Sequence, residues 1–211
     1  MKILIESQYL PSVAYFCLLA RAEEIHLEVH ENFEKQSYRN RMEIVGANQV
    51  QNLSIPVHHG GRKILITEVE IDYKQKWMNN HWRAIQSAYG KAPFFDYYGA
   101  YFKDEFEVEH KCLFDFNQSL LTLCLKLLRL KLNIVKSDVY TKTPPEGVID
   151  YRSHIHPKKP LDSLTWFQPQ EYHQIFGKDF APSMSILDLL FCTGPDALEV
   201  LYQSSAALMN K

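Results

Sequence analysis

The sequence lacks the short motifs that mark common nucleotide and metal sites. Its 211 residues contain no GxGxxG pattern and no P-loop, which excludes a standard dinucleotide or Walker-type phosphate site. The cysteines show no CxxC or CxH spacing, so they predict buried, reduced thiols rather than a zinc site: Cys17, Cys112, Cys124 and Cys192. The sequence therefore contains no motif that identifies a cofactor, and the cofactor stays unknown.

Long apolar runs and flexible linkers are also missing. The longest uncharged apolar run, residues 116–125, includes Asn117 and Gln118 and stops at Lys126, whereas a membrane-spanning helix needs about 20 apolar residues. The chain starts without a cleavable signal sequence, so we expect a cytoplasmic protein with no membrane span. No Gly/Ser/Pro-rich linker divides the chain, which predicts a single domain over residues 1–211.

The chain has no excess of charge of one sign. Its formal net charge is −2, with 23 Lys and Arg against 25 Asp and Glu, so nothing draws the whole molecule toward nucleic acid and we expect no nucleic-acid partner. A hydrophobic content of 46% excludes disorder. Any anion-binding site must therefore be local.

The first thirty residues predict a βαβ unit. Residues 2–5 form the apolar run of a buried strand, residues 13–20 carry apolar side chains at helical spacing, and residues 25–29 alternate as a strand does. A right-handed crossover makes these strands parallel and places the loop of residues 7–12 at the carboxyl edge of the sheet. Ligands of open α/β sheets bind at that edge.

The rest of the chain predicts further strands followed by helices. We expect strands at 42–45, 53–57 and 63–71, separated by turns at 46–49 and 58–61, and then helices at 72–90, 93–102, 115–133, 185–193 and 196–209. Residues 141–169 carry five prolines, which predict a long ordered loop that is either a lid or a disordered segment. The fold prediction is α/β: a single domain with a βαβ start, a mixed sheet and a helix-rich C-terminal half.

The stretch of residues 35–41 is the leading site candidate because it combines cations with polar side chains directly after the second predicted strand. Lys35, Arg39 and Arg41 would attract a phosphate or carboxylate if they faced one pocket, since guanidinium groups bind such oxyanions through paired hydrogen bonds. Tyr38 and Asn40 lie between them. The alternative is a solvated turn or a strand edge guarded by charge.

Several histidines have two interpretations each. His81 lies on the aromatic face of a predicted helix, where it is either a buried, hydrogen-bonded histidine or a catalytic acid-base group. His154 and His156 have the same-face spacing of a metal pair, but no third ligand accompanies them, and we expect no metal site. The leucine-rich helix at 115–133 is apolar beyond one face, which predicts either deep burial or an interface in a homo-oligomer.

Four blocks, in order along the chain, resemble the WbqC-like protein family. They are Gln8-Tyr9-Leu10-Pro11 with Tyr15-Phe16, the stretch Lys35-Gln36-Ser37-Tyr38-Arg39-Asn40-Arg41, Trp77 and His81-Trp82 with Ala88-Tyr89, and residues 176–182 with 185–191. The resemblance covers essentially the whole chain. It implies a bacterial protein associated with surface-polysaccharide and O-antigen assembly, and it implies no particular reaction.

Charge and resemblance together predict an enzyme of surface-polysaccharide biosynthesis that transfers a small acyl- or glycosyl-type group. We expect a small substrate bearing a phosphate or carboxylate, with His81 as catalytic base and a binding set of Gln8, Tyr9, Lys35, Tyr38, Arg39, Asn40 and Arg41. The alternative is a non-catalytic binding or assembly protein of the same pathway. Convergence of these side chains in one cleft would favour the enzyme.

Overall fold

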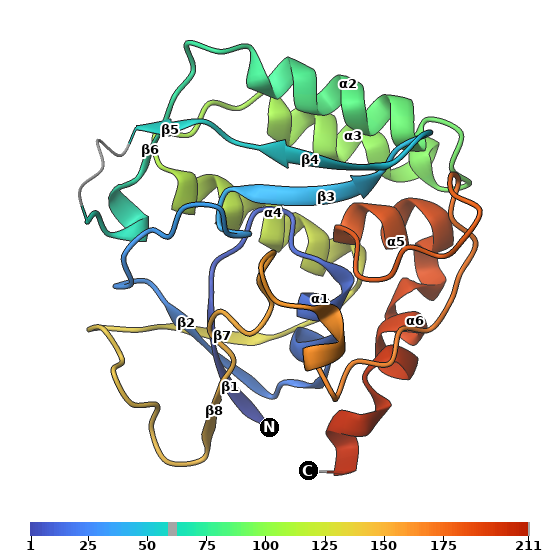
Figure 1. The fold of residues 1–211 in the computed structure, drawn as a ribbon. Helices are drawn as coiled ribbons and strands as arrows, with labels where there is room; N and C mark the ends of the chain where they lie inside the picture. The colour runs from blue at the N-terminus through green and yellow to red at the C-terminus, as the bar shows by residue number, and fades with distance from the viewer. Residues whose placement is uncertain (59–62, 211) are drawn as a thin grey trace.

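A parallel sheet of four strands forms the base of the molecule in the computed structural model, which describes residues 1–58 and 63–210 (Figure 1). The strand order is β7-β2-β1-β8, with β1 at Lys2–Glu6, β2 at Glu24–Glu28, β7 at Asn133–Lys136 and β8 at Val148–Asp150. The inner strand β1 is apolar because both of its faces are covered, and Ile3, Leu4 and Ile5 are buried, whereas β2 alternates buried Ile25 with the partly exposed His26.

The predicted βαβ unit is confirmed. Helix α1 (Val13–Arg21) carries the chain from β1 to β2, and the two strands pair in parallel with Ile3 opposite Ile25. The order in which strands are added to the sheet then reverses. Strand β7 is added at the edge next to β2, whereas β8 is added at the opposite edge, next to β1. The carboxyl ends of β1 and β8 therefore form the switch point at which ligands of open α/β sheets bind.

Antiparallel pairing occurs in separate, smaller sheets. Strands β3 (Arg41–Val45) and β4 (Val50–Ser54) form a hairpin around the predicted turn at 46–49, and β5 (Val57–His58) pairs with β6 (Glu70–Ile71). The α/β fold with a βαβ start is confirmed, while parallel and antiparallel strands belong to different sheets rather than to one mixed sheet. Of the predicted turn at 58–61, only His58 lies within the described residues.

Two strand predictions in this region are wrong. The expected strand at 53–57 is interrupted after Ser54, close to Pro56, which has no N–H to donate to a ladder. Residues 63–71 form a 3₁₀ turn (Ile66–Glu68) and only the short β6, because the Ile66 N–H bonds to the carbonyl of Glu31 instead of to a neighbouring strand. The loop after β2 supplies that partner.

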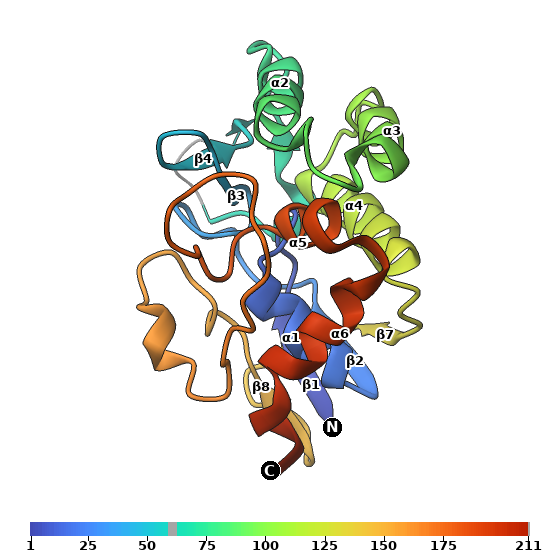
Figure 2. The same cartoon turned by 90° about the vertical axis from the view of Figure 1, so that its right-hand side faces the viewer.

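Helices cover the hairpin and one side of the sheet (Figures 1 and 2). They are α2 (Trp77–Tyr89), α3 (Phe95–Phe106), α4 (Leu113–Leu127), α5 (Ile186–Thr193) and α6 (Ala197–Ser204). The leucine-rich α4 buries most of its apolar side chains, including Leu113, Leu120 and Cys124, whereas Leu125 and Leu127 stay partly exposed, so burial accounts for most but not all of its wide apolar surface. It ends at Leu127 rather than at 133 because Arg129 adopts a left-handed backbone with φ 55°.

The proline-rich region holds more structure than its sequence predicts. The prediction of a strandless loop over residues 141–169 is wrong, because β8 lies within it together with a 3₁₀ turn at Leu161–Ser163. Proline tolerates this arrangement since β8 is an edge strand and Pro145 and Pro157 fall outside it. Among the described residues, no helix combines the length and the apolar character needed to cross a membrane.

Candidate functional site

The loops after β1 and β8 meet at the switch point of the sheet. The Gln8 side-chain amide donates to the carbonyl of Ile155 at 3.2 Å, and the Ser153 N–H donates to the Glu6 carboxylate at 2.9 Å. The Tyr9 N–H donates to the carbonyl of Tyr38 at 2.9 Å. Two segments that the sequence placed at this edge, the loop after β1 and the stretch 35–41, thus lie side by side.

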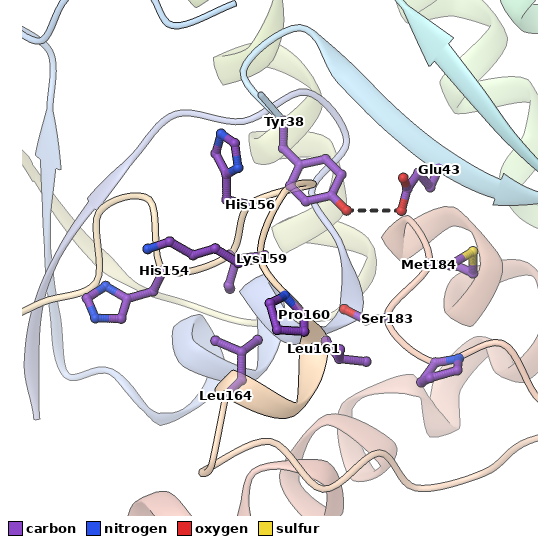
Figure 3. A pocket seen from close by; sticks show the side chains of 12 residues that line it. Tyr38, Glu43, His154, His156, Lys159, Pro160, Leu161, Leu164, Ser183 and Met184 are labelled. Atoms are coloured by element: carbon purple, nitrogen blue, oxygen red, sulfur yellow. Dashed lines mark hydrogen bonds between the residues drawn. The ribbon is translucent and has the colours of Figure 1, made fainter. Parts of the chain in front are cut away.

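A pocket of about 110 Å³ opens beside this junction (Figure 3). Three separate segments of the chain line it: Tyr38 and Glu43; His154, Ile155, His156, Lys159, Pro160, Leu161 and Leu164; and Pro182, Ser183 and Met184. Its floor is apolar and its rim carries both charges. Such a combination of apolar lining and few polar groups is typical of small-molecule sites.

Tyr38 and Glu43 form one wall of the pocket. The Tyr38 hydroxyl donates to the Glu43 carboxylate at 3.0 Å (Figure 3), and the Ser185 N–H donates to the Glu43 main-chain carbonyl at 2.8 Å. Burial raises the pKa of Tyr38, and the neighbouring Glu43 charge raises it further, so the phenol stays protonated. This wall therefore presents an oriented carboxylate.

The opposite wall comes from the segment after β8. His156 Nδ1 accepts the Lys158 N–H at 3.1 Å, which places the proton of the neutral ring on Nε2, 3.5 Å from a Glu34 carboxylate oxygen. Burial lowers the pKa of His156, although Glu34 acts in the other direction. His154 and Lys159 are exposed at the rim and form no ion pair among the described residues.

Arg39 does not line this pocket. Its guanidinium donates to both carboxylate oxygens of Glu31, at 2.8 and 2.6 Å, and to Glu34 at 3.2 Å, and the residue is 3% exposed. Burial acts to lower the pKa of Arg39, but the hydrogen bonds that its guanidinium donates to Glu31, together with the charges of the nearby carboxylates, outweigh burial and raise the pKa. In this structure Arg39 ties the chain together, with its donors directed at protein carboxylates.

The other members of the predicted binding set are spread around the junction. Asn40 donates to the Ile55 carbonyl at 2.8 Å, and Lys35 is exposed without lining the pocket. Arg41 is half-buried, and its Nε has no hydrogen-bond partner among the described residues. Within the stretch 35–41, Tyr38 is the residue that faces the pocket.

His81 lies behind Tyr9 and away from the pocket lining. Its Nδ1 is 2.9 Å from the Tyr9 hydroxyl, the residue is 4% exposed, and burial lowers its pKa to about 4. Tyr9, Tyr38, Glu43 and Ser183 border a gap beside the pocket that is too small for a water molecule. The assignment of His81 as catalytic base stays a prediction.

Comparison with known proteins identifies the family. The model of the WbqC-like protein family matches residues 6–161 and 162–200, which together are most of the chain. This chain belongs to the WbqC-like protein family. The uncharacterized protein Rv1507c of Mycobacterium tuberculosis is 28% identical to it over 227 aligned residues, covering 94% of this chain and 96% of the relative. No solved structure matches it.

Of the residues that line the pocket of this WbqC-like protein, the predicted site set contains Tyr38; the polar residues that it missed include Glu43, Lys159 and Ser183. Glu43 could have been found from its period-two spacing to Arg41 in a predicted strand, which places both on one face. Ser183 carries a left-handed backbone with φ 60°, an uncommon conformation for serine that sequence does not reveal. Nothing in the local sequence distinguishes Lys159 from its neighbour Lys158.

The two histidines spaced as a metal pair, His154 and His156, lie at the pocket. Within residues 1–58 and 63–210, no group of three or more His, Cys, Asp or Glu side chains is arranged to hold a metal ion. His154 and His156 instead contribute ring nitrogens near the pocket rim.

Proposed function

We propose that this WbqC-like protein is an enzyme of bacterial surface-polysaccharide biosynthesis that transfers a small group carried by a phosphate- or carboxylate-bearing substrate. The pathway rests on the family resemblance. The anion-binding role rests on one observation: Lys159 and His154 lie at a pocket beside the switch point of the sheet and form no ion pair within residues 1–58 and 63–210. Neighbouring cations such as Arg39 and Arg152 are already paired with carboxylates.

Pocket size favours an acyl-type group over a whole glycosyl donor. A volume of about 110 Å³ is well below the roughly 300 Å³ at which pockets for larger ligands begin. It can enclose the reactive end of a substrate whose remainder lies in solvent. His81 and the rim histidines are the candidate proton carriers in this proposal.

The test is a calorimetric titration of the protein with acyl-coenzyme A and nucleotide-sugar donors, comparing Lys159→Met with Lys158→Met. Lys158 is an equally exposed neighbour outside the pocket lining, so it is the matched control. Removing a charged hydrogen-bond donor from a bound anion costs about 1.5 to 3 kcal/mol, or about ten- to a hundredfold in affinity. Equal binding by the two variants would remove Lys159 from the site.

The sequence-based assignment of the anion to Lys35, Arg39 and Arg41 is tested in the same titration. Lys35→Met combined with Arg41→Met leaves the Arg39–Glu31 pair intact. If these residues hold the substrate, the double variant loses binding that Lys159→Met retains. Loss in Lys159→Met alone would place the anion at the segment after β8.

A non-catalytic assembly protein of the same pathway is the second candidate. One observation favours it: a groove of about 300 Å³ lies between α2 and α3, lined by Met78, Asn79, Trp82, Lys103, Phe106 and Glu107. On α3, Tyr97 and Tyr101 are 69% and 50% exposed. A protein that binds none of the small donors, yet loses association with the polysaccharide machinery when Tyr97 and Tyr101 become serine, would support this candidate.

A further inference from the structure

The pocket carries charges of opposite sign at its two ends. Glu43 lies at one end, on β3, and His154 and Lys159 lie at the other, on the segment after β8 (Figure 3). The space between them contains no side chain that neutralises either group among the described residues. Glu43 has one side-chain hydrogen-bond partner there, the neutral Tyr38 hydroxyl.

Other charged residues of the molecule form ion pairs. Glu31 is paired with Arg39 at 2.6 Å, and Asp150 is paired with Arg152 at 2.7 Å. Neither Glu43 nor Lys159 takes part in an ion pair within the described residues. An unpaired carboxylate and an unpaired ammonium across one cavity are complementary to a ligand that carries both opposite charges.

Shape and lining set the size of such a ligand. The volume of about 110 Å³ is less than the roughly 150 Å³ of an engineered cavity that encloses benzene. Leu161 and Leu164 provide apolar surface between the charged ends, and Met184 lies beside Glu43 (Figure 3). A molecule with a short aliphatic part and two charged groups fits this description, whereas a nucleotide does not.

Tyr38 gives the carboxylate end a fixed direction. Its hydroxyl donates to one Glu43 oxygen, so that oxygen is occupied and the other is left to accept from a ligand. The Tyr38 main chain is held by the Tyr9 N–H, and the Glu43 main chain by the Ser185 N–H. An ammonium group that enters the pocket therefore meets an acceptor that is already oriented.

We infer that the pocket binds a small zwitterion, with its primary ammonium group against Glu43 and its carboxylate or phosphate against Lys159 and His154. The inference rests on the proposed anion-binding function and adds the chemical class of the ligand. A short-chain α-amino acid and an aminoalkyl phosphate share this chemistry. The amino acid carries a carboxylate where the aminoalkyl phosphate carries a phosphate, and both carry the ammonium group that Glu43 would bind.

The experiment is a ligand titration followed by protein NMR, with L-alanine, N-acetyl-L-alanine, 2-aminoethyl phosphate and its N-acetylated form as probes. Acetylation removes the positive charge and leaves the anion. We expect each free amine to bind about tenfold or more tightly than its acetylated form. The stronger of the two amines identifies carboxylate or phosphate as the natural anion.

Two variants assign the effect to the two ends of the pocket. Glu43→Gln is expected to bind free and acetylated probes alike, because the carboxylate that distinguishes them is gone. Lys159→Met is expected to weaken all four probes by a similar factor and to keep the preference for the amine. Lys158→Met serves as the matched control and is expected to behave as the parent protein does.

Two outcomes would overturn the inference. Acetylated probes that bind as well as the free amines would leave an anion site without zwitterion recognition, and the proposed function would stand. Absence of binding by all four probes would also reject a zwitterion ligand. The donor titration described under the proposed function then decides separately whether the pocket binds anions on larger substrates.

Discussion

Two groups of charged side chains are organised in opposite ways: the buried carboxylates Glu28 and Glu31, which are paired with arginines, and the pocket residues Glu43 and Lys159. In the first, Glu28 is fully buried and accepts hydrogen bonds from the N–H groups of His30 and Thr141 and from Ser137 and Arg152. In the second, Glu43 and Lys159 face a cavity with no ion-pair partner among the described residues.

The difference separates charges that hold the fold from charges that are available to a ligand. A buried carboxylate must be fully satisfied, since an uncompensated charge in the interior costs several kcal/mol. A partly exposed carboxylate such as Glu43 keeps contact with water and needs no partner. The pairing state of each charged residue therefore distinguishes the two groups.

The largest expected effect on stability comes from breaking an ion pair of the first group, that of Arg39 with Glu31. Arg39→Met leaves Glu31 buried without its cation and is expected to lower the free energy of unfolding by about 3 to 5 kcal/mol. Urea denaturation measures this. Glu34→Gln removes the exposed partner of the same arginine and is the control, expected to cost about 1 kcal/mol or less. Similar losses in both variants would contradict the distinction.

An intermediate effect is expected from His81, a buried base outside both groups. Its folded pKa of about 4 lies below the ordinary value of 6.5, so the unfolded chain binds the proton more readily. Stability is complete above pH 6.5 and falls as pH drops toward 4, by roughly 3 kcal/mol at most from this residue. Unfolding free energies measured between pH 7 and about 4.5 should show this slope.

His81→Gln removes the titrating ring and is expected to flatten that part of the acid slope, while the exposed His154→Gln keeps it. Burial raises the carboxyl pKa values of Glu31 and Asp188, which act in the opposite direction, but they are present in parent and variant alike and cancel in the difference. If the unfolding free energies of the parent and of His81→Gln change equally with pH, protonation of the buried His81 ring does not destabilise the fold.

The smallest expected effect on stability belongs to the unpaired group. Glu43→Gln removes a charge that pairs with no cation among the described residues, and its main-chain bonds to Ser185 and the hairpin remain. We expect the free energy of unfolding to change by no more than about 0.5 kcal/mol, and the midpoint of thermal unfolding measures this change. A large loss would place Glu43 with the structural charges and would weaken the ligand proposal.

Sequence alone predicted the parts of the fold that depend on local periodicity. The β1-α1-β2 unit follows from alternation and helical spacing within thirty residues, and α2 ends at Gly90 as its sequence indicates. The strand β8 could not be predicted, because prolines surround it and its pairing partner β1 is far away in the chain. Long-range partners decide such segments.

The site was only partly predictable for the same reason. The stretch 35–41 was placed at the correct edge, but pattern does not reveal that Glu31 engages Arg39 while Tyr38 faces the cavity. Lys159 and Ser183 reach the pocket only because β8 joins the sheet and because the residues before α5 bond to β3 and to the loop after β1. No local signal encodes that convergence.

The main-chain bonds from Tyr9 to Tyr38 and from Ser185 to Glu43 also shape the thermodynamics of binding. Because the pocket walls are already held to one another, an incoming molecule loses its own freedom but orders little of the protein. For the proposed ligand, we therefore expect little affinity to be lost to ordering the protein and no slow rearrangement step during association. A pocket assembled in this way selects ligands by how well they fit a preformed shape.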